Sequence, residues 1–88
     1  MNNPSRNARR LADDPMRSRA WFAGMLWRAF PAPSEREVSE AAAAALGVSD
    51  RQVRNWLRCQ HDAALRHVLA VIAIAGAEVV FRRMEGGE

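Results

Sequence analysis

The sequence predicts an all-α domain of four to five helices, with a short C-terminal strand as an option near its end. Three observations lead to this prediction. Apolar residues make up 49% of the chain, and they recur at the three- and four-residue spacing of helices. Residues that start helices precede these stretches, and Pro or Gly follows them. The length of 88 residues suits one compact domain with a modest core.

The chain begins with a polar and basic stretch, residues 1–12, that has no helical periodicity. We interpret it as a flexible tail. Its Arg6, Arg9 and Arg10 would lie along phosphates or enter a minor groove, or they would only favour solubility. Residues 13–85 are then predicted to form the folded domain, and residues 86–88 a flexible end.

The first predicted helix begins at Asp14 and Pro15, because Asp is a good N-cap and Pro fits the first helical position. It runs to about Phe30, where two prolines follow. Trp21 is expected to lie at the edge of the helix and to be partly exposed. The expected core stripe consists of Ala23, Leu26, Trp27 and Phe30, with Phe22 beside it.

Two short helices joined by a tight turn are predicted over residues 34–58. Ser34 can cap the first of them, with Glu37 reaching back to complete a capping box. Ser49 can cap the second, again with a partner, Gln52, three residues later. The two caps therefore fix where both helices begin.

The residues between the two caps also have a physical role. Five consecutive alanines at 41–45 favour a helix and allow a second helix to approach closely. Gly47 stands where this helix must end in a left-handed conformation, which Gly adopts at little cost. Val48 is then expected to be a small apolar plug in the turn.

This pattern resembles the helix-turn-helix of phage repressor and Cro-type (Xre-like) DNA-binding regulators, over Ser39 to Arg58. That family has a small residue inside the first helix, here Ala43, and Gly in the turn four residues later. Its apolar positions beside the Gly and on the inner side of the second helix are matched by Leu46, Val48, Val53 and Trp56. The resemblance implies that the second helix, residues 50–58, enters the major groove of DNA. A helical hairpin used only for packing is the alternative.

The second helix of this motif has one apolar and one polar side. At about 100° per residue, Val53, Trp56 and Leu57 cluster together, opposite a face centred near Arg51 and Asn55. The candidate DNA-binding residues on and around this outer face are Ser49, Asp50, Arg51, Gln52, Arg54, Asn55 and Arg58.

Six of the seven candidates have an expected role, and Gln52 lies nearer the edge of the face. Arg51 suits guanine and Asn55 suits adenine, since both can make two hydrogen bonds to those bases. Asp50 lies at the helix N-terminus and either contacts a base or only stabilises the helix. Arg54 and Arg58 would bind phosphates, as would Ser49 with the first-turn amides. For the arginines, the alternative is a solvated charged face.

After a turn at 59–61, Asp62 is expected to cap a further helix that runs to about Ala75 and ends at Gly76. Its expected inward face consists of Leu65, Val68, Leu69 and Ile72, whereas Val71 and Ile74 point elsewhere. Because this helix is apolar on more than one side, we favour a dimer interface. Residues 78–83 fit either a short strand or a continuation of the helix.

Composition excludes several classes of function. The formal net charge is +3, all 13 basic residues are Arg, and residues 1–33 hold six Arg and two Asp, a balance of +4. Cys59 is the only cysteine, so no disulfide forms within the chain. We expect a cytoplasmic, nucleoid-associated protein without a signal peptide or membrane contact. No catalytic arrangement and no metal-ligand spacing is evident, so neither an enzyme nor a cofactor is expected.

The sequence thus predicts a homodimeric bacterial or phage transcriptional regulator that binds a specific double-stranded DNA site. Two alternatives stay open. One is the DNA-binding subunit of recombination machinery, similar to an excisionase or transposase, which would use the same helix. The other is a protein-interaction module that docks RNA polymerase or a second regulator through residues 68–77 and Trp21.

Overall fold

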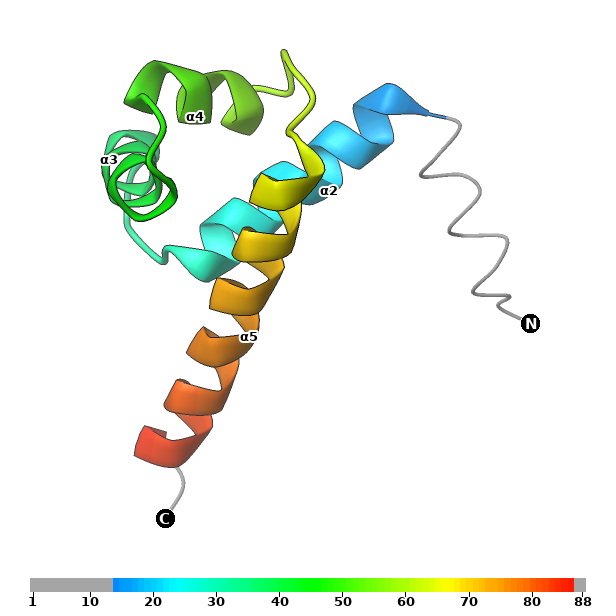
Figure 1. The fold of residues 1–88 in the computed structure, drawn as a ribbon. Helices are drawn as coiled ribbons and strands as arrows, with labels where there is room; N and C mark the ends of the chain where they lie inside the picture. The colour runs from blue at the N-terminus through cyan, green and yellow to red at the C-terminus, as the bar shows by residue number, and fades with distance from the viewer. Residues whose placement is uncertain (1–13, 87–88) are drawn as a thin grey trace, which may run out of the picture.

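The computed structural model describes residues 14–86 and contains four helices there (Figure 1). They are α2 (Pro15–Ala29), α3 (Glu35–Leu46), α4 (Asp50–Leu57) and α5 (Leu65–Gly86). Residues 14–86 contain no strand, and the prediction of an all-α fold is confirmed. The predicted tail, residues 1–12, and residues 87–88 at the opposite end lie outside the described residues.

The core lies where α2, α4 and α5 meet, with α3 closing the side of α4. Figure 1 shows α3 and α4 as a unit at one end of the molecule, while the second half of α5 extends away from them. The largest fully buried side chains are Trp56, Leu26, Val38, Val53 and Val71. They come from all four described helices, which therefore share one core.

Helix α2 begins as the sequence predicted. One carboxylate oxygen of Asp14 accepts hydrogen bonds from the backbone N–H groups of Met16 and Arg17, at 3.0 and 3.3 Å. Pro15 occupies the first helical position, where its missing N–H costs nothing. The helix ends at Ala29, one residue before the predicted end, and Phe30 is its C-cap.

The buried face of α2 differs from the predicted stripe. Phe22, Ala23, Leu26 and Ala29 are buried, whereas Trp27 is 40% exposed. The real face is therefore rotated toward Phe22 and Ala29. Two alanines on this face let neighbouring helices approach closely, which a Trp in the same place would prevent. Trp21 is 42% exposed, so the prediction for this residue is confirmed.

Helix α5 does not begin with an Asp62 cap. It begins at Leu65, and the carbonyl of Ala64 accepts the N–H groups of His67 and Val68 at 2.9 and 3.1 Å. Asp62 instead accepts a hydrogen bond from Nε of Arg19 at 2.7 Å. The carboxylate thus ties the α4–α5 loop to α2, a partnership between residues 43 positions apart that local sequence does not reveal.

Helix α5 also continues through Gly76 to Gly86, so the predicted end at Gly76 and the optional strand at 78–83 are wrong, and the alternative, a continuation of the helix, is confirmed. A Gly inside a helix costs only about 1 kcal/mol relative to Ala. Ala73, Ala75 and Ala77, which are strong helix formers, lie close to it on both sides. The last predicted flexible segment, 86–88, therefore begins inside the described helix.

The inward face of α5 is the largest error of the sequence prediction. Val71 and Ala75 are buried, and Val68 and Ile74 pack against the core, while Leu65, Leu69 and Ile72 are 71%, 57% and 41% exposed. Periodicity cannot choose a face on a helix that is apolar all round. The side of α5 that carries Val71 and Ala75 packs into the core shared with α2, and Leu65, Leu69 and Ile72 are turned outward.

Candidate nucleic-acid interface

Helix α4 is fixed by two buried side chains, as predicted. Val53 is 0% and Trp56 1% exposed, and Leu57 packs against the same core. The Trp56 ring meets the Phe22 ring edge-on, with centroids 5.4 Å apart, and it contacts the His67 ring at 5.3 Å. Because these partners belong to α2 and α5, the orientation of α4 is set by the whole domain.

The turn before α4 has the predicted left-handed residue. Gly47 has a φ of 69° and a ψ of 34°, and its N–H donates to the carbonyl of Ala43 at 3.0 Å. The N–H of Val48 donates to the same carbonyl at 3.2 Å, and Val48 packs against the core. Residues 47–49 therefore form a tight, well-bonded connection between α3 and α4.

Both helices of the unit have the predicted Ser caps. The hydroxyl of Ser34 accepts the N–H of Glu37 at 3.2 Å and donates to its carboxylate at 2.9 Å, so the partner bonds the hydroxyl and not the backbone. The hydroxyl of Ser49 accepts the N–H of Gln52 at 3.0 Å. Among the described hydrogen bonds, the Gln52 side chain does not complete the second box. The start of α4 is nevertheless fixed.

All seven predicted contact residues lie on or next to α4, which at 1.5 Å per residue is about 12 Å long. The exposed ones are Ser49, Asp50, Arg51, Gln52 and Arg58, and the half-buried ones are Arg54 and Asn55. Gln52 is thus more exposed, and Asn55 less exposed, than the sequence predicted. The α4–α5 loop passes close to Asn55, since the N–H of Gln60 donates to its carbonyl at 2.9 Å.

Ion pairs reduce the charge of this face. Arg54 lies 3.7 Å from the carboxylate of Asp50, one turn earlier in the same helix. Arg58 donates from Nε and Nη2 to one carboxylate oxygen of Glu35, at 3.1 and 2.8 Å. Among the side chains that the structure describes, no acid pairs with Arg51. Arg51 is therefore the cation of α4 that is most available to an anionic partner.

Glu35 is the functional residue that sequence reasoning missed. It begins α3, and its carboxylate orients the guanidinium at the C-cap of α4. Opposite charges 23 positions apart have no periodic relation, so no sequence signal pointed to the pair. The side chain of Arg58 is 56% and that of Glu35 is 38% exposed, and such solvent-accessible pairs contribute at most about 1 kcal/mol to stability. The pair orients Arg58 more than it stabilises the fold.

The side chains of this face can form hydrogen bonds with a polymer that carries negative charges and both donor and acceptor groups. Arg51 offers a planar, bidentate donor, and Gln52 and Asn55 each offer an amide that donates and accepts at once. The N-terminus of α4 adds partial positive charge beside Ser49. These groups are what base edges and phosphates require.

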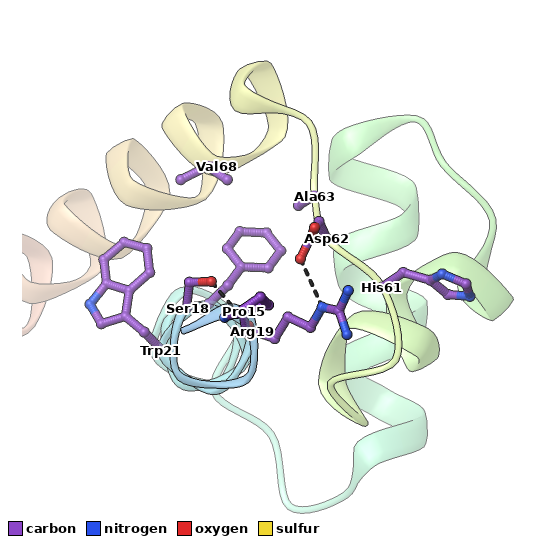
Figure 2. A pocket seen from close by; sticks show the side chains of 9 residues that line it. Pro15, Ser18, Arg19, Trp21, His61, Asp62, Ala63 and Val68 are labelled. Atoms are coloured by element: carbon purple, nitrogen blue, oxygen red, sulfur yellow. Dashed lines mark hydrogen bonds and ion pairs between the residues drawn. The ribbon is translucent and has the colours of Figure 1, made fainter. Parts of the chain in front are cut away.

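An open pocket of about 340 Å³ lies on another part of the surface, between α2 and the segment that leads into α5 (Figure 2). Trp21 and Phe22 line it from α2, and Val68 lines it from α5. The charged side chains in its lining, Arg19 and Asp62, bond each other. Because they are already paired, we assign no ligand to this pocket.

No match to the chain was found among protein-family models, curated proteins or solved structures. Within residues 14–86, no helix combines the length and apolar character needed to cross a membrane. In the same residues, no group of three or more His, Cys, Asp or Glu side chains gathers as metal ligands would. The predicted contacts of Arg6, Arg9 and Arg10 fall outside the described residues.

Proposed function

We propose that this protein binds double-stranded DNA with α4 in the major groove, as a bacterial or phage transcriptional regulator. One observation carries the proposal. Helix α4 has one face locked into the core by Val53 and Trp56, and it presents Arg51, Gln52 and Asn55 on the other side. A rigid helix with base-reading side chains on its free face is what sequence readout requires.

The dimensions support the same proposal. An α-helix with its side chains is about 10–12 Å across, and it fits a major groove that is about 12 Å wide. Arg51 and Gln52 lie in the first turn, the part of a recognition helix that reaches deepest into the groove. In this arrangement Arg51 and Asn55 read bases and Gln52 joins them, while Ser49 and the first amides bind a phosphate.

The ion pairs affect how tightly one domain could bind. Arg54 and Arg58 carry paired acids, so a single α4 offers few uncompensated charges to phosphates. Affinity for DNA depends largely on the number of phosphates neutralised. We therefore propose that two copies bind together, on half-sites about one helical turn apart. A DNA-binding subunit of recombination machinery would use the same face.

The test is fluorescence anisotropy with a pool of random duplexes and with single duplexes selected from it, at two salt concentrations. The Arg51→Ala/Asn55→Ala variant should keep its helix content and lose at least tenfold in preference for the selected duplex, since each contact is worth about 1–3 kcal/mol. Arg36→Ala is the matched control, because Arg36 is exposed on α3 and pairs with Glu40. Failure of wild-type protein to bind at low salt would overturn the proposal.

A second candidate function, docking of RNA polymerase or another regulator, is favoured by one observation. Helix α5 exposes several large apolar side chains, among them Leu65 and Leu69, to solvent. Binding through such a surface should hardly respond to salt, whereas binding through phosphates weakens steeply as salt rises. The salt series therefore separates the two candidates.

A further inference from the structure

Helix α5 has a second apolar face that the described helices leave largely exposed, although Val79 lines a pocket beside Trp27 and Arg28 of α2. Leu65, Leu69, Ile72 and Val79 are 71%, 57%, 41% and 50% exposed, and Gly76 between them is exposed as well. Their positions advance by four, three, four and three residues. This is the heptad spacing that keeps one stripe of a helix facing a partner helix. We call these five residues the α5 seam.

The seam forms one continuous apolar patch, and the largest such patch of a monomer is often functional. Val80 lies beside it, 57% exposed, and no charged residue stands on the seam line between Leu65 and Val79. The apolar side chains together expose roughly 300–500 Å² in one copy, as much as the largest apolar patch of a typical monomer. Figure 1 also shows that the last turns of α5 extend past the end of α2 without a neighbour. A helical segment without a packing partner is only marginally stable in water.

We propose that the α5 seam of a second copy of this chain covers it, with the two helices antiparallel. A two-fold axis near residue 74 places Leu69 opposite Val79 of the second copy, and Ile72 opposite Gly76. A large side chain then meets a small one at the centre, so the backbones can approach closely. In this register the large side chains of one seam lie opposite the small residues of the other. This complementarity favours a second copy of the chain over an unrelated partner.

Charge favours the antiparallel arrangement. Arg83 is exposed and lies seven residues after Gly76, so it extends the seam line by one heptad position. Parallel helices would stack the Arg83 guanidinium groups of the two copies on each other. Antiparallel helices place the two Arg83 residues about 27 Å apart, each at the Leu65 end of the other copy, where the carboxylate of Asp62 already bonds Arg19. Arg66 is at the same end, but it points about 100° away from Leu65 around the helix.

The area is consistent with a stable dimer. Stable interfaces bury about 800 Å² on each partner. The exposed apolar side chains supply about half of that, and the alanines beside the seam and the stems of flanking arginines can supply more. The dimer rests on the proposed function only in its purpose, which is to bring two copies of α4 to one DNA site. The dimer provides the second α4, but its existence can be measured without DNA.

Sedimentation velocity over about 1–100 μM protein, without DNA, is the first test. Wild-type protein should be a dimer in the upper part of this range. Leu69→Glu and Ile72→Glu should each raise the dimer dissociation constant at least 100-fold with unchanged helix content, since both side chains are exposed in one copy. Ala77→Glu adds the same charge away from the seam and should leave the dimer intact. A wild-type monomer at every concentration, or equal disruption by Ala77→Glu, would overturn the inference.

Cysteine cross-linking tests the orientation. In a Cys59→Ser background, Ala73→Cys lies near the proposed two-fold axis and should form a disulfide between copies. Leu65→Cys should not, because the antiparallel register separates residue 65 of the two copies by about 27 Å. A disulfide formed by Leu65→Cys would show parallel helices and refute the antiparallel register. Because no DNA is present, neither result bears on whether α4 binds DNA.

Discussion

Replacement of Gly47 by Ala tests the turn that sets the angle between α3 and α4. Gly47 has a φ of 69°, a left-handed conformation that costs an L-residue about 1–2 kcal/mol. An added Cβ would meet nothing within 4 Å, so the cost is conformational and not steric. The Ala also lowers the conformational entropy of the unfolded chain, and this offsets about 0.4–1 kcal/mol of the cost. We expect a net destabilisation of about 1 kcal/mol.

Gly24 provides a matched control. It lies in the middle of α2, is exposed, and an added Cβ there would also meet nothing within 4 Å. In a regular helix Ala is more favourable than Gly by about 1 kcal/mol. The same chemical change should therefore stabilise the domain at position 24 and destabilise it at position 47. The two variants should differ by about 2 kcal/mol, with backbone conformation as the cause.

Urea unfolding at one fixed protein concentration, followed by circular dichroism, measures this difference. The concentration must be constant because any dimer contributes to apparent stability. In a domain of this size, 1 kcal/mol shifts the melting temperature by roughly 4–8 °C, so thermal scans would resolve it too. If Gly47→Ala were neutral or stabilising, residue 47 would not be left-handed. The helix-turn-helix geometry would then be wrong.

Three further predictions concern the core, the end of α4 and its charge. Trp56→Ala should leave the domain largely unfolded by circular dichroism, since losing a buried Trp costs about 3–5 kcal/mol; a folded variant would contradict its central position. Cys59 has a φ of 60°, so Cys59→Gly should stabilise by up to about 1 kcal/mol in urea, and a loss of stability would count against this conformation. Glu35→Gln should release Arg58 and change stability by less than about 1 kcal/mol. If Arg58 then binds one more phosphate, the slope of log affinity against log salt should steepen by about 0.9; an unchanged slope would refute that role.

Features that depend on neighbours in the sequence were predictable. The caps at Asp14, Ser34 and Ser49 and the left-handed Gly47 each involve bonds between residues at most four positions apart. A side chain and the amide it caps are held together by the backbone itself. The spacing of these residue types therefore predicted where α2 and α3 begin and end and where α4 begins. It also predicted the apolar side of α4.

Features that depend on packing were decided only by the tertiary structure. Sequence periodicity placed Leu65, Leu69 and Ile72 inside, and the fold buries Val71 and Ala75 in their place. When a helix is apolar all round, burial of either face releases similar free energy per unit area. Which face is buried then depends on how well its side chains pack against the neighbouring helices.

The same limit applies to charge. Glu35 neutralises Arg58, and Asp62 bonds Arg19, because folding brings together residues that are 23 and 43 positions apart. Neither pair follows from spacing along one helix. The sequence by itself thus determined the helices from α2 to α4 and how the turn before α4 is built, but not where α5 begins and ends. Only the tertiary structure decided which sides of those helices remain exposed, because that choice depends on how closely two helices can approach.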